Sequence, residues 1–203
     1  MTLMSNNPNI YAFIDGENLF KSFRKMGYKN ADYVKLYWWL KQKKNVKKTF
    51  LYVGLVDGDT VRRGKYDELQ KLGYEMKVKP VQVYSGKLLE VHTTCPECEH
   101  EYVHEEQMSD RSKANCDAEL TVDVTRACMI DGECDEVIIF SGDGDFSYLY
   151  EFVVGQLHKK VTVYSPLKYP ASLLTSSKLK ELDRQGCIRL INLESVAQHR
   201  AIL

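Results

Sequence analysis

Short apolar runs alternate with longer amphipathic stretches along most of this chain, and that alternation restricts the folds it can adopt. The run 10–14 is apolar throughout, as in a strand buried on both faces, whereas 31–44 repeats its apolar residues at helical spacing. The expected strands are 10–14, 50–56, 76–83, 136–140, 161–164 and 188–191, and the expected helices are 19–25, 31–44, 59–72, 116–130, 146–158 and 177–184. Strands and helices in this order predict an α/β fold, with a mainly parallel central sheet and helices on both faces.

The size and composition fit one globular domain. The chain has 203 residues, 44% of them hydrophobic, and we expect a single domain over 9–203 with an insertion over 85–115. Lysine plus arginine and aspartate plus glutamate both total 28, so the overall charge gives no argument for nucleic acid. No signal peptide and no transmembrane run is recognisable, so we expect a cytoplasmic protein with no membrane partner.

Aspartates follow the expected strands at positions where chemistry is common. Asp15 ends the first strand, and Asp143 and Asp145 come just after the strand 136–140. Ligands of open parallel sheets bind at the carboxyl ends of the strands. Asp117 opens the helix after the insertion, where a negative charge is favourable. These acids are therefore expected to share one cleft, although Asp-Gly sequences are also ordinary turn chemistry.

Carboxylates that share a cleft repel one another, and a divalent cation offsets that repulsion. A site built from oxygen atoms favours Mg²⁺ or Mn²⁺ over zinc. Such a site suits hydrolysis of a phosphodiester, because a metal can activate water and neutralise phosphate oxygens. Asp123 and Glu119 are excluded, because helical geometry turns both away from Asp117. Asn18 is expected either to position a metal-bound water or phosphate or simply to cap a helix.

Three blocks of sequence resemble the signature blocks of NYN domains, which belong to the PIN-like nuclease superfamily. They are Phe-Ile-Asp-Gly-Glu-Asn-Leu at 13–19, Asn-Cys-Asp-Ala-Glu-Leu at 115–120 with Val-Asp-Val at 122–124, and Ser-Gly-Asp-Gly-Asp-Phe at 141–146. The middle block departs from the family pattern, which often has a glycine after the lysine where this chain has Ala114.

The resemblance implies a three-layer α/β/α PIN-like fold and RNA as the substrate. It also implies a Mg²⁺ or Mn²⁺ site formed by aspartates and an asparagine that matches the polar partner in the first block. The positions that match these catalytic and metal-site residues are Asp15, Asp117, Asp143, Asp145 and Asn18.

The insertion interrupts the regular pattern and carries a Cys-Pro-Glu-Cys knuckle. We expect a small Cys/His hairpin here, with Cys95 and Cys98 binding a structural Zn²⁺ ion together with His92 and His104. The spacing does not fix the second ligand pair, so His100 and Cys116 stay open as ligands. A metal-free hairpin is the alternative.

Three basic residues are expected near the acids. Arg62 and Arg63 follow the second strand, and Lys113 precedes Asp117, so all three are suited to phosphate contacts. A solvated surface is the alternative for each. The lysine-rich stretch 41–48 is expected to lie on the opposite edge of the sheet, as solvated surface.

The leading hypothesis is a metal-dependent endoribonuclease with RNA as its partner, while a homodimer is left open. The alternatives are a catalytically weak RNA-binding or regulatory module, and a metal-dependent phosphohydrolase acting on a small molecule or a protein. The chain carries neither a Walker A lysine motif nor a glycine-rich dinucleotide loop, which argues against nucleotide-cofactor chemistry.

Overall fold

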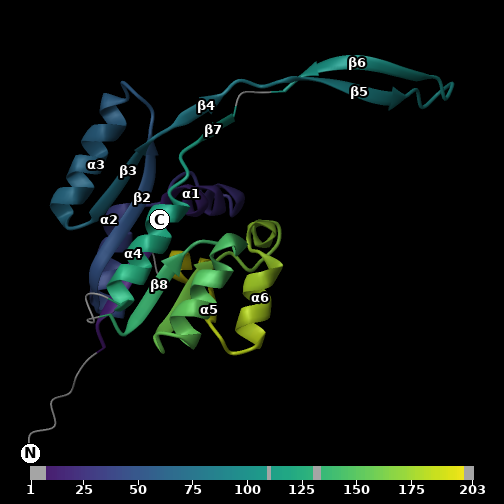
Figure 1. Ribbon diagram of the computed structural model, residues 1–203. Coiled ribbons are helices and arrows are strands. Elements are labelled where there is room, and N and C mark those ends of the chain that lie inside the picture. Colours follow the sequence, from purple (N-terminus) through teal and green to yellow (C-terminus); the bar gives the residue numbers. More distant parts are fainter. Residues whose placement is uncertain (1–7, 109–110, 130–133, 199–203) are drawn as a thin grey trace, which may run out of the picture.

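A six-stranded sheet forms the centre of the molecule. The computed structural model describes residues 8–108, 111–129 and 134–198. Its main sheet has the order β10-β9-β8-β1-β2-β3, and every neighbouring pair is parallel (Figure 1). The strands are β1 (Ile10–Asp15), β2 (Val46–Leu55), β3 (Glu75–Pro80), β8 (Glu136–Phe140), β9 (Lys160–Ser165) and β10 (Arg189–Asn192). The predicted α/β class with a mainly parallel sheet is confirmed.

Helices cover both faces of this sheet. One face carries α1 (Gly16–Lys25), α2 (Tyr33–Lys44), α3 (Thr60–Leu72) and α7 (Glu194–Gln198); the other carries α4 (Asp117–Met129), α5 (Ser147–Gly155) and α6 (Ser177–Arg184). Two short 3₁₀ helices, η1 (Gly144–Phe146) and η2 (Ala171–Leu174), complete the set. None of the helices in these described ranges is long and apolar enough to cross a membrane.

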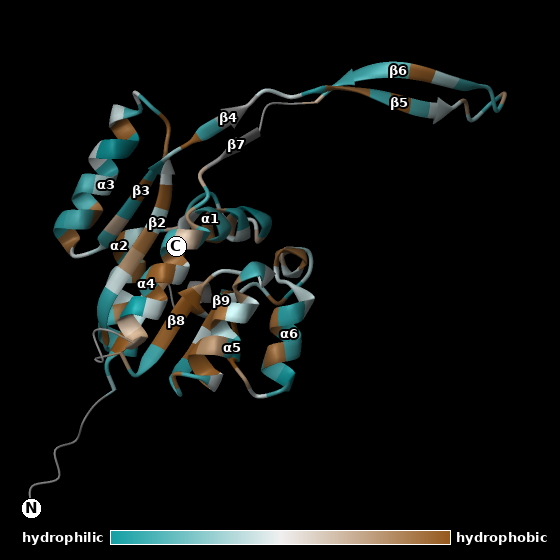
Figure 2. Ribbon diagram, viewed as in Figure 1, coloured by the Kyte–Doolittle hydropathy of each residue, from teal (hydrophilic) through white to brown (hydrophobic). Residues whose placement is uncertain are grey.

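The central strand β1 shows why the molecule has three layers. Ala12 and Ile14 belong to the core under α1 and α2, whereas Tyr11 and Phe13 belong to the core under α4 and α5. Successive side chains of a strand point to opposite faces, so an apolar run without polar interruptions must be covered on both sides. Figure 2 shows the corresponding hydrophobic colour along the central strands. This arrangement is the three-layer α/β/α fold that the resemblance implied.

The boundaries of α3 agree with the expected helix 59–72. Asp59 caps its start by accepting a hydrogen bond from the backbone N–H of Arg62 (2.9 Å), and Gly73 ends it in the left-handed region at φ 119°. The expected start of β2 was wrong, because the strand begins at Val46 and not at Phe50. Lys47 and Lys48, the last lysines of the stretch 41–48, therefore belong to β2, next to the buried Val46.

The expected strand 76–83 was wrong as one element. β3 ends at Pro80, which has no N–H to continue a ladder, and the chain then leaves the main sheet. β4 (Gln82–Tyr84) pairs with β7 (Arg111–Lys113), and beyond them β5 (Leu88–Thr94) pairs with β6 (Glu101–Gln107). This two-stranded ribbon projects away from the body of the molecule (Figure 1). It begins at Gln82, three residues before the predicted start of the insertion.

Candidate active site

The predicted acids lie around the carboxyl ends of two neighbouring strands. β1 and β8 pair directly, with Ile14 opposite Phe140, so the residues that follow each strand lie on one edge of the sheet. Asp15 is the last residue of β1, while Asp143 and Asp145 follow β8. Asp117 is the first residue of α4, which packs on β1. Parallel pairing therefore brings the first and third sequence blocks to the same edge.

Asp15 is a partly buried carboxylate with two hydrogen bonds. It caps α1 by accepting a hydrogen bond from the Asn18 backbone N–H (3.0 Å), and the Ser141 hydroxyl donates to its other oxygen (3.2 Å). Burial raises its pKa from 3.8 to about 6, and the charges of Asp117 and Glu17 add to the rise against the effect of both hydrogen bonds. Asp15 and Asp117 therefore interact electrostatically.

Asn18 connects α1 to the loop after β8. Its side-chain oxygen accepts a hydrogen bond from the backbone N–H of Gly142 (2.9 Å), and the Ser22 hydroxyl lies 3.5 Å from the same oxygen. The cap of α1 is Asp15, so Asn18 does not have the capping role that the sequence left open. Its contact instead fixes the loop that carries Asp143 relative to Asp15.

The third block forms one wall of an open pocket. Asp143 accepts a hydrogen bond from the Asp145 backbone N–H (2.9 Å), and its own N–H donates to the Ser141 hydroxyl (3.2 Å). The pocket has a volume of about 360 Å³, and its lining residues are Asn18, Gly142, Asp143, Gly144, Asp145, Leu173, Leu174 and Ser176. The last three come from η2 and the cap of α6 and were not predicted. A serine before the expected helix 177–184 was the signal for Ser176 as a cap.

Tyr150, on α5, is a further residue that sequence reasoning missed. Its hydroxyl is fully buried and has no hydrogen-bond partner among the described residues. Burial raises the pKa of Tyr150, and the charges of Asp15 and Asp143 raise it further. The Tyr150 hydroxyl thus interacts electrostatically with both acids, and it is a buried polar atom that lacks a hydrogen-bond partner among the described residues.

Asp117 lies at the start of α4, where its backbone N–H donates to the Asn115 side chain (3.0 Å). The approach to this position differs from the family pattern at Ala114. A Cβ atom built on Gly54 would lie 2.5 Å from the Ala114 methyl group, so the absence of a side chain at Gly54 makes room for it. Gly54 on β2 therefore makes room for the methyl group of Ala114, which a glycine at position 114 would lack.

The donor set fits a hard divalent cation, although the acids are not gathered as a complete cage. Within the described ranges, no group of three or more histidine, cysteine, aspartate or glutamate side chains is placed to hold a metal ion. Mg²⁺ needs less, because it keeps several waters and is usually held by one or two carboxylates together with substrate phosphates. Asp15 and Asp117 are a like-charged pair of this kind, and the unpartnered Tyr150 hydroxyl is nearby.

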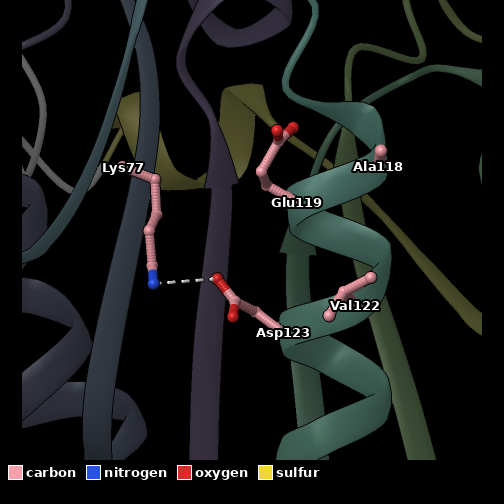
Figure 3. Close-up of a pocket in the computed structure, with 5 residues that line it drawn as sticks. All are labelled: Lys77, Ala118, Glu119, Val122 and Asp123. Atoms are coloured by element: carbon pink, nitrogen blue, oxygen red, sulfur yellow. Dashed lines mark ion pairs between the residues drawn. The ribbon is translucent and has the colours of Figure 1, made fainter.

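Two further acids of α4 face a different surface. Asp123 accepts a hydrogen bond from the buried Tyr52 hydroxyl (3.0 Å) and pairs with Lys77 (3.3 Å), while Glu119 pairs with Lys79 (2.7 Å). Figure 3 shows Asp123 directed toward Lys77 and β3 in a shallow pocket of about 240 Å³. Both acids are therefore engaged with lysines of β3.

Replacing Asp123 with alanine should reduce the free energy of unfolding by about 1–3 kcal/mol, because the buried Tyr52 hydroxyl loses its acceptor. Urea unfolding at pH 7.5 measures the change. The double variant with Tyr52→Phe should recover part of the loss, since no buried donor is then left unsatisfied. Equal stability of wild type and Asp123→Ala would contradict this role for the hydrogen bond.

Of the basic residues predicted to contact substrate, Arg62 and Arg63 do not line the pocket. Arg62 and Arg63 lie in the first turn of α3, exposed, at the carboxyl end of β2, and Arg62 pairs with Asp59 (3.5 Å). Lys113 is in β7, opposite Gln82, and its side chain lies outside the described part of the structure. Arg62 and Arg63 therefore share the predicted edge of the sheet, next to the acids and not among them.

The four predicted zinc ligands, Cys95, Cys98, His92 and His104, do not come together as one set within a single chain. In the β5–β6 pairing Val91 is opposite His104 and Val103 is opposite His92, which places the two histidines on opposite faces of the hairpin. Cys116 is buried in the core, with its sulfur 3.9 Å from the Val53 carbonyl oxygen. The Cys95 thiol and the Cys98 thiol do interact, and backbone N–H groups of Glu97 and Cys98 lower the pKa of Cys95.

Comparison with known proteins agrees with this fold. The crystal structure of a protein of unknown function from Vibrio parahaemolyticus superposes with a TM-score of 0.63 and 25% identity, covering 94% of this chain and 97% of that one. The low amplitude and bright protein LabA of Synechococcus elongatus is 28% identical over 144 residues. That match covers 70% of this chain and 65% of LabA, so it spans less than two thirds of the length of LabA.

The family assignment rests on a longer match. The model of the NYN domain family matches residues 9–183, which include the three signature blocks and every acid described above. The α/β/α layers are what the resemblance to that family implied. This chain therefore belongs to the NYN domain family, within the PIN-like nuclease superfamily.

Proposed function

We propose that this protein is a metal-dependent ribonuclease that hydrolyses phosphodiester bonds of RNA at the carboxyl edge of its sheet. Asp15, Asp117, Asp143 and Asp145 would hold Mg²⁺ or Mn²⁺. When bound, the ion supplies charge neutralisation for the phosphate and a lowered pKa for the attacking water. The observation that carries the proposal is the direct parallel pairing of β1 and β8, which brings Asp15 and the loop with Asp143 and Asp145 to one edge of the sheet, where Asn18 joins them by its contact with Gly142.

The residues of the chain have separate tasks in this proposal. Asp15 would bind the cation together with Asp117, because the positive ion would offset the repulsion between these two carboxylates. Ser141 holds the Asp15 carboxylate in place, and Asn18 holds the loop with Asp143 at a fixed position. The exposed Arg62 and Arg63 are available for the RNA backbone on the same edge of the sheet.

The test compares Asp143→Asn with a matched change outside the pocket. Purified protein is incubated with single-stranded and structured RNA in Mg²⁺ or Mn²⁺, and cleavage rates are read from gels. Asp143→Asn should lower the rate by about 100-fold, a loss typical of removing one charge-stabilising group. Asp57→Asn removes the same charge from an exposed aspartate after β2, and it should cleave like wild type.

Each other outcome of this comparison has a defined meaning. Equal cleavage by wild type and Asp143→Asn would show that the RNA is cut without Asp143, which would contradict the proposed site. Asp123→Ala is a second control, because Asp123 contacts Tyr52 and Lys77 and should retain full cleavage. Cleavage that persists in EDTA would contradict the dependence on a metal.

A second candidate function is an RNA-binding or regulatory module with little catalysis. It is favoured by one observation: the described acids do not form a ready cluster of three ligands. RNA binding by wild type, without cleavage in either metal, would favour this candidate over the nuclease. Hydrolysis of small phosphate esters in place of RNA would instead favour the phosphohydrolase alternative.

A further inference from the structure

The Cys-Pro-Glu-Cys turn forms the tip of the β5–β6 hairpin. The Cys95 backbone N–H donates to the His100 carbonyl (2.9 Å), and the Glu99 N–H donates to the Cys95 carbonyl (2.9 Å). Glu99 adopts a left-handed conformation with φ 56°, which reverses the chain. The N–H groups of Glu97 and Cys98 point to the Cys95 sulfur, and the Cys98 thiol contacts it. Both sulfur atoms therefore lie together in a turn that is closed by backbone hydrogen bonds.

One chain supplies only half of a zinc site at this tip. Structural zinc takes four ligands in a tetrahedron, and thiolates are among its preferred ones. Within the described ranges no third histidine, cysteine, aspartate or glutamate joins the two cysteines, and His92 and His104 lie on opposite faces of the hairpin. A second pair of thiolates in the same geometry would complete the site.

The length and position of the hairpin leave its tip accessible to another molecule. Each strand has seven residues, a reach of roughly 23 Å at the rise of a β-strand. Among the described strands, β5 and β6 pair only with each other, and Figure 1 shows the tip at the end farthest from the body. Two copies can therefore meet at their tips without contact between their sheets and helices.

An isolated two-stranded hairpin is at best marginally stable in water. This one also exposes apolar side chains in the described part of the chain, among them Leu88, Leu89, Tyr102 and Val103. A metal ion that closes the tip would stabilise it, because binding free energy of a structural metal adds to folding free energy. Tyr102, opposite Thr93, lies near the tip with the half-complete ligand set, whereas Leu88 and Leu89 lie at the base of the hairpin.

We propose that the tips of two copies of this chain bind one Zn²⁺ ion between them, with Cys95 and Cys98 of each copy as its four ligands. The negative charge of the hairpin opposes contact between two tips unless a cation lies between them. Residues 88–107 contain six glutamates and no lysine or arginine, so two tips repel each other when no cation is present. The same charge disfavours RNA as the occupant of this arm.

The test uses the full chain, reduced with a phosphine and stripped of metal, and measures mass by light scattering as Zn²⁺ is added. We expect a monomer without metal and a dimer with one zinc per two chains. Higher salt should strengthen zinc-dependent pairing, because it screens the glutamates. Co²⁺ in place of zinc should give the visible absorption of tetrahedral thiolate ligation. No readout uses RNA, so the result is independent of the proposed nuclease activity.

Matched variants separate this site from its alternatives. Cys98→Ser should lose both zinc and the dimer, whereas Cys187→Ser, at a partly buried cysteine in the body, should keep both. His92→Ala combined with His104→Ala should also keep both. One zinc per monomer, no zinc bound, or a dimer that survives Cys98→Ser would each overturn the proposal. A disulfide between Cys95 and Cys98 that persists under reduction, with no zinc taken up, would do the same.

Discussion

Asp15→Asn should lose RNA cleavage by roughly 1000-fold, the equivalent of several kcal/mol of transition-state stabilisation by a metal ligand. The same substitution should make the metal-free protein more stable than wild type at neutral pH. Asparagine caps a helix about as well as aspartate, so the bond from the Asn18 N–H is retained. What disappears is the free-energy cost of ionising a partly buried carboxylate beside Asp117.

The pH dependence of this gain has a definite sign. The pKa of Asp15 is about 6 in the folded chain against 3.8 when unfolded, so the folded state binds more protons between these values. The free energy of unfolding of wild type therefore falls as pH rises from about 4 to about 6, by at most about 3 kcal/mol from this group. Below pH 4 the carboxyl group is neutral in both states, and the difference from Asp15→Asn should be smallest.

Urea unfolding in EDTA at a series of pH values measures the difference between the two proteins. The advantage of Asp15→Asn should increase with pH and level off above about 7. Adding Mg²⁺ should then stabilise wild type and leave the variant almost unchanged, because binding to the folded state adds stability. Parallel pH profiles for the two proteins would contradict the raised pKa. Undiminished cleavage by the variant would remove Asp15 from the active site.

The second large effect is expected at Gly16, the first residue of α1. A Cβ atom there would lie 2.6 Å from the Tyr52 carbonyl oxygen and 2.7 Å from a methyl group of Val53. β2 cannot move aside, because it is paired with β1 on one side and β3 on the other. Gly16→Ala should therefore reduce the free energy of unfolding by about 1–3 kcal/mol, as overpacking in a core does.

Gly64→Ala is the matched comparison for this prediction. Gly64 lies inside α3 and is exposed, and a Cβ atom built on it meets nothing within 4 Å. Alanine is the better helix former, so this variant should gain about 1 kcal/mol. Opposite shifts of the urea midpoint for the two substitutions would support the packing argument. A shift of the same sign at both positions would contradict it.

Much of the architecture follows from local pattern. The apolar run 10–14 has no polar position, so it predicts a strand that is covered on both faces. In the structure β1 lies between β8 and β2, inside the sheet. Asp59 and Gly73 define α3 through cap chemistry that acts within a few residues. β2 was placed four residues too late, because Lys47 and Lys48 interrupt the apolar pattern between the buried Val46 and Thr49.

The functional site divides in the same way. Asp15, Asp143 and Asp145 were predictable, because each follows a recognisable strand and parallel strands end on one edge. Tyr150 and Ser176 were not, because a buried hydroxyl and a distant cap enter the site only through packing of α5, η2 and α6. The histidines of the insertion show how register limits such a prediction. They were expected to join the two cysteines although no spacing fixed them, and the register of β5 and β6 places His92 and His104 on opposite faces.

The alternation of strands and helices, the family blocks and the acids at strand ends could be predicted, since they depend on neighbours along the chain. The contacts of each acid could not. Asp15 accepts hydrogen bonds from Asn18 and Ser141 and has a raised pKa, while Asp123 contacts Tyr52 and Lys77. Burial and electrostatic interaction depend on distances in space, and these join residues as far apart in sequence as Asp15 and Ser141.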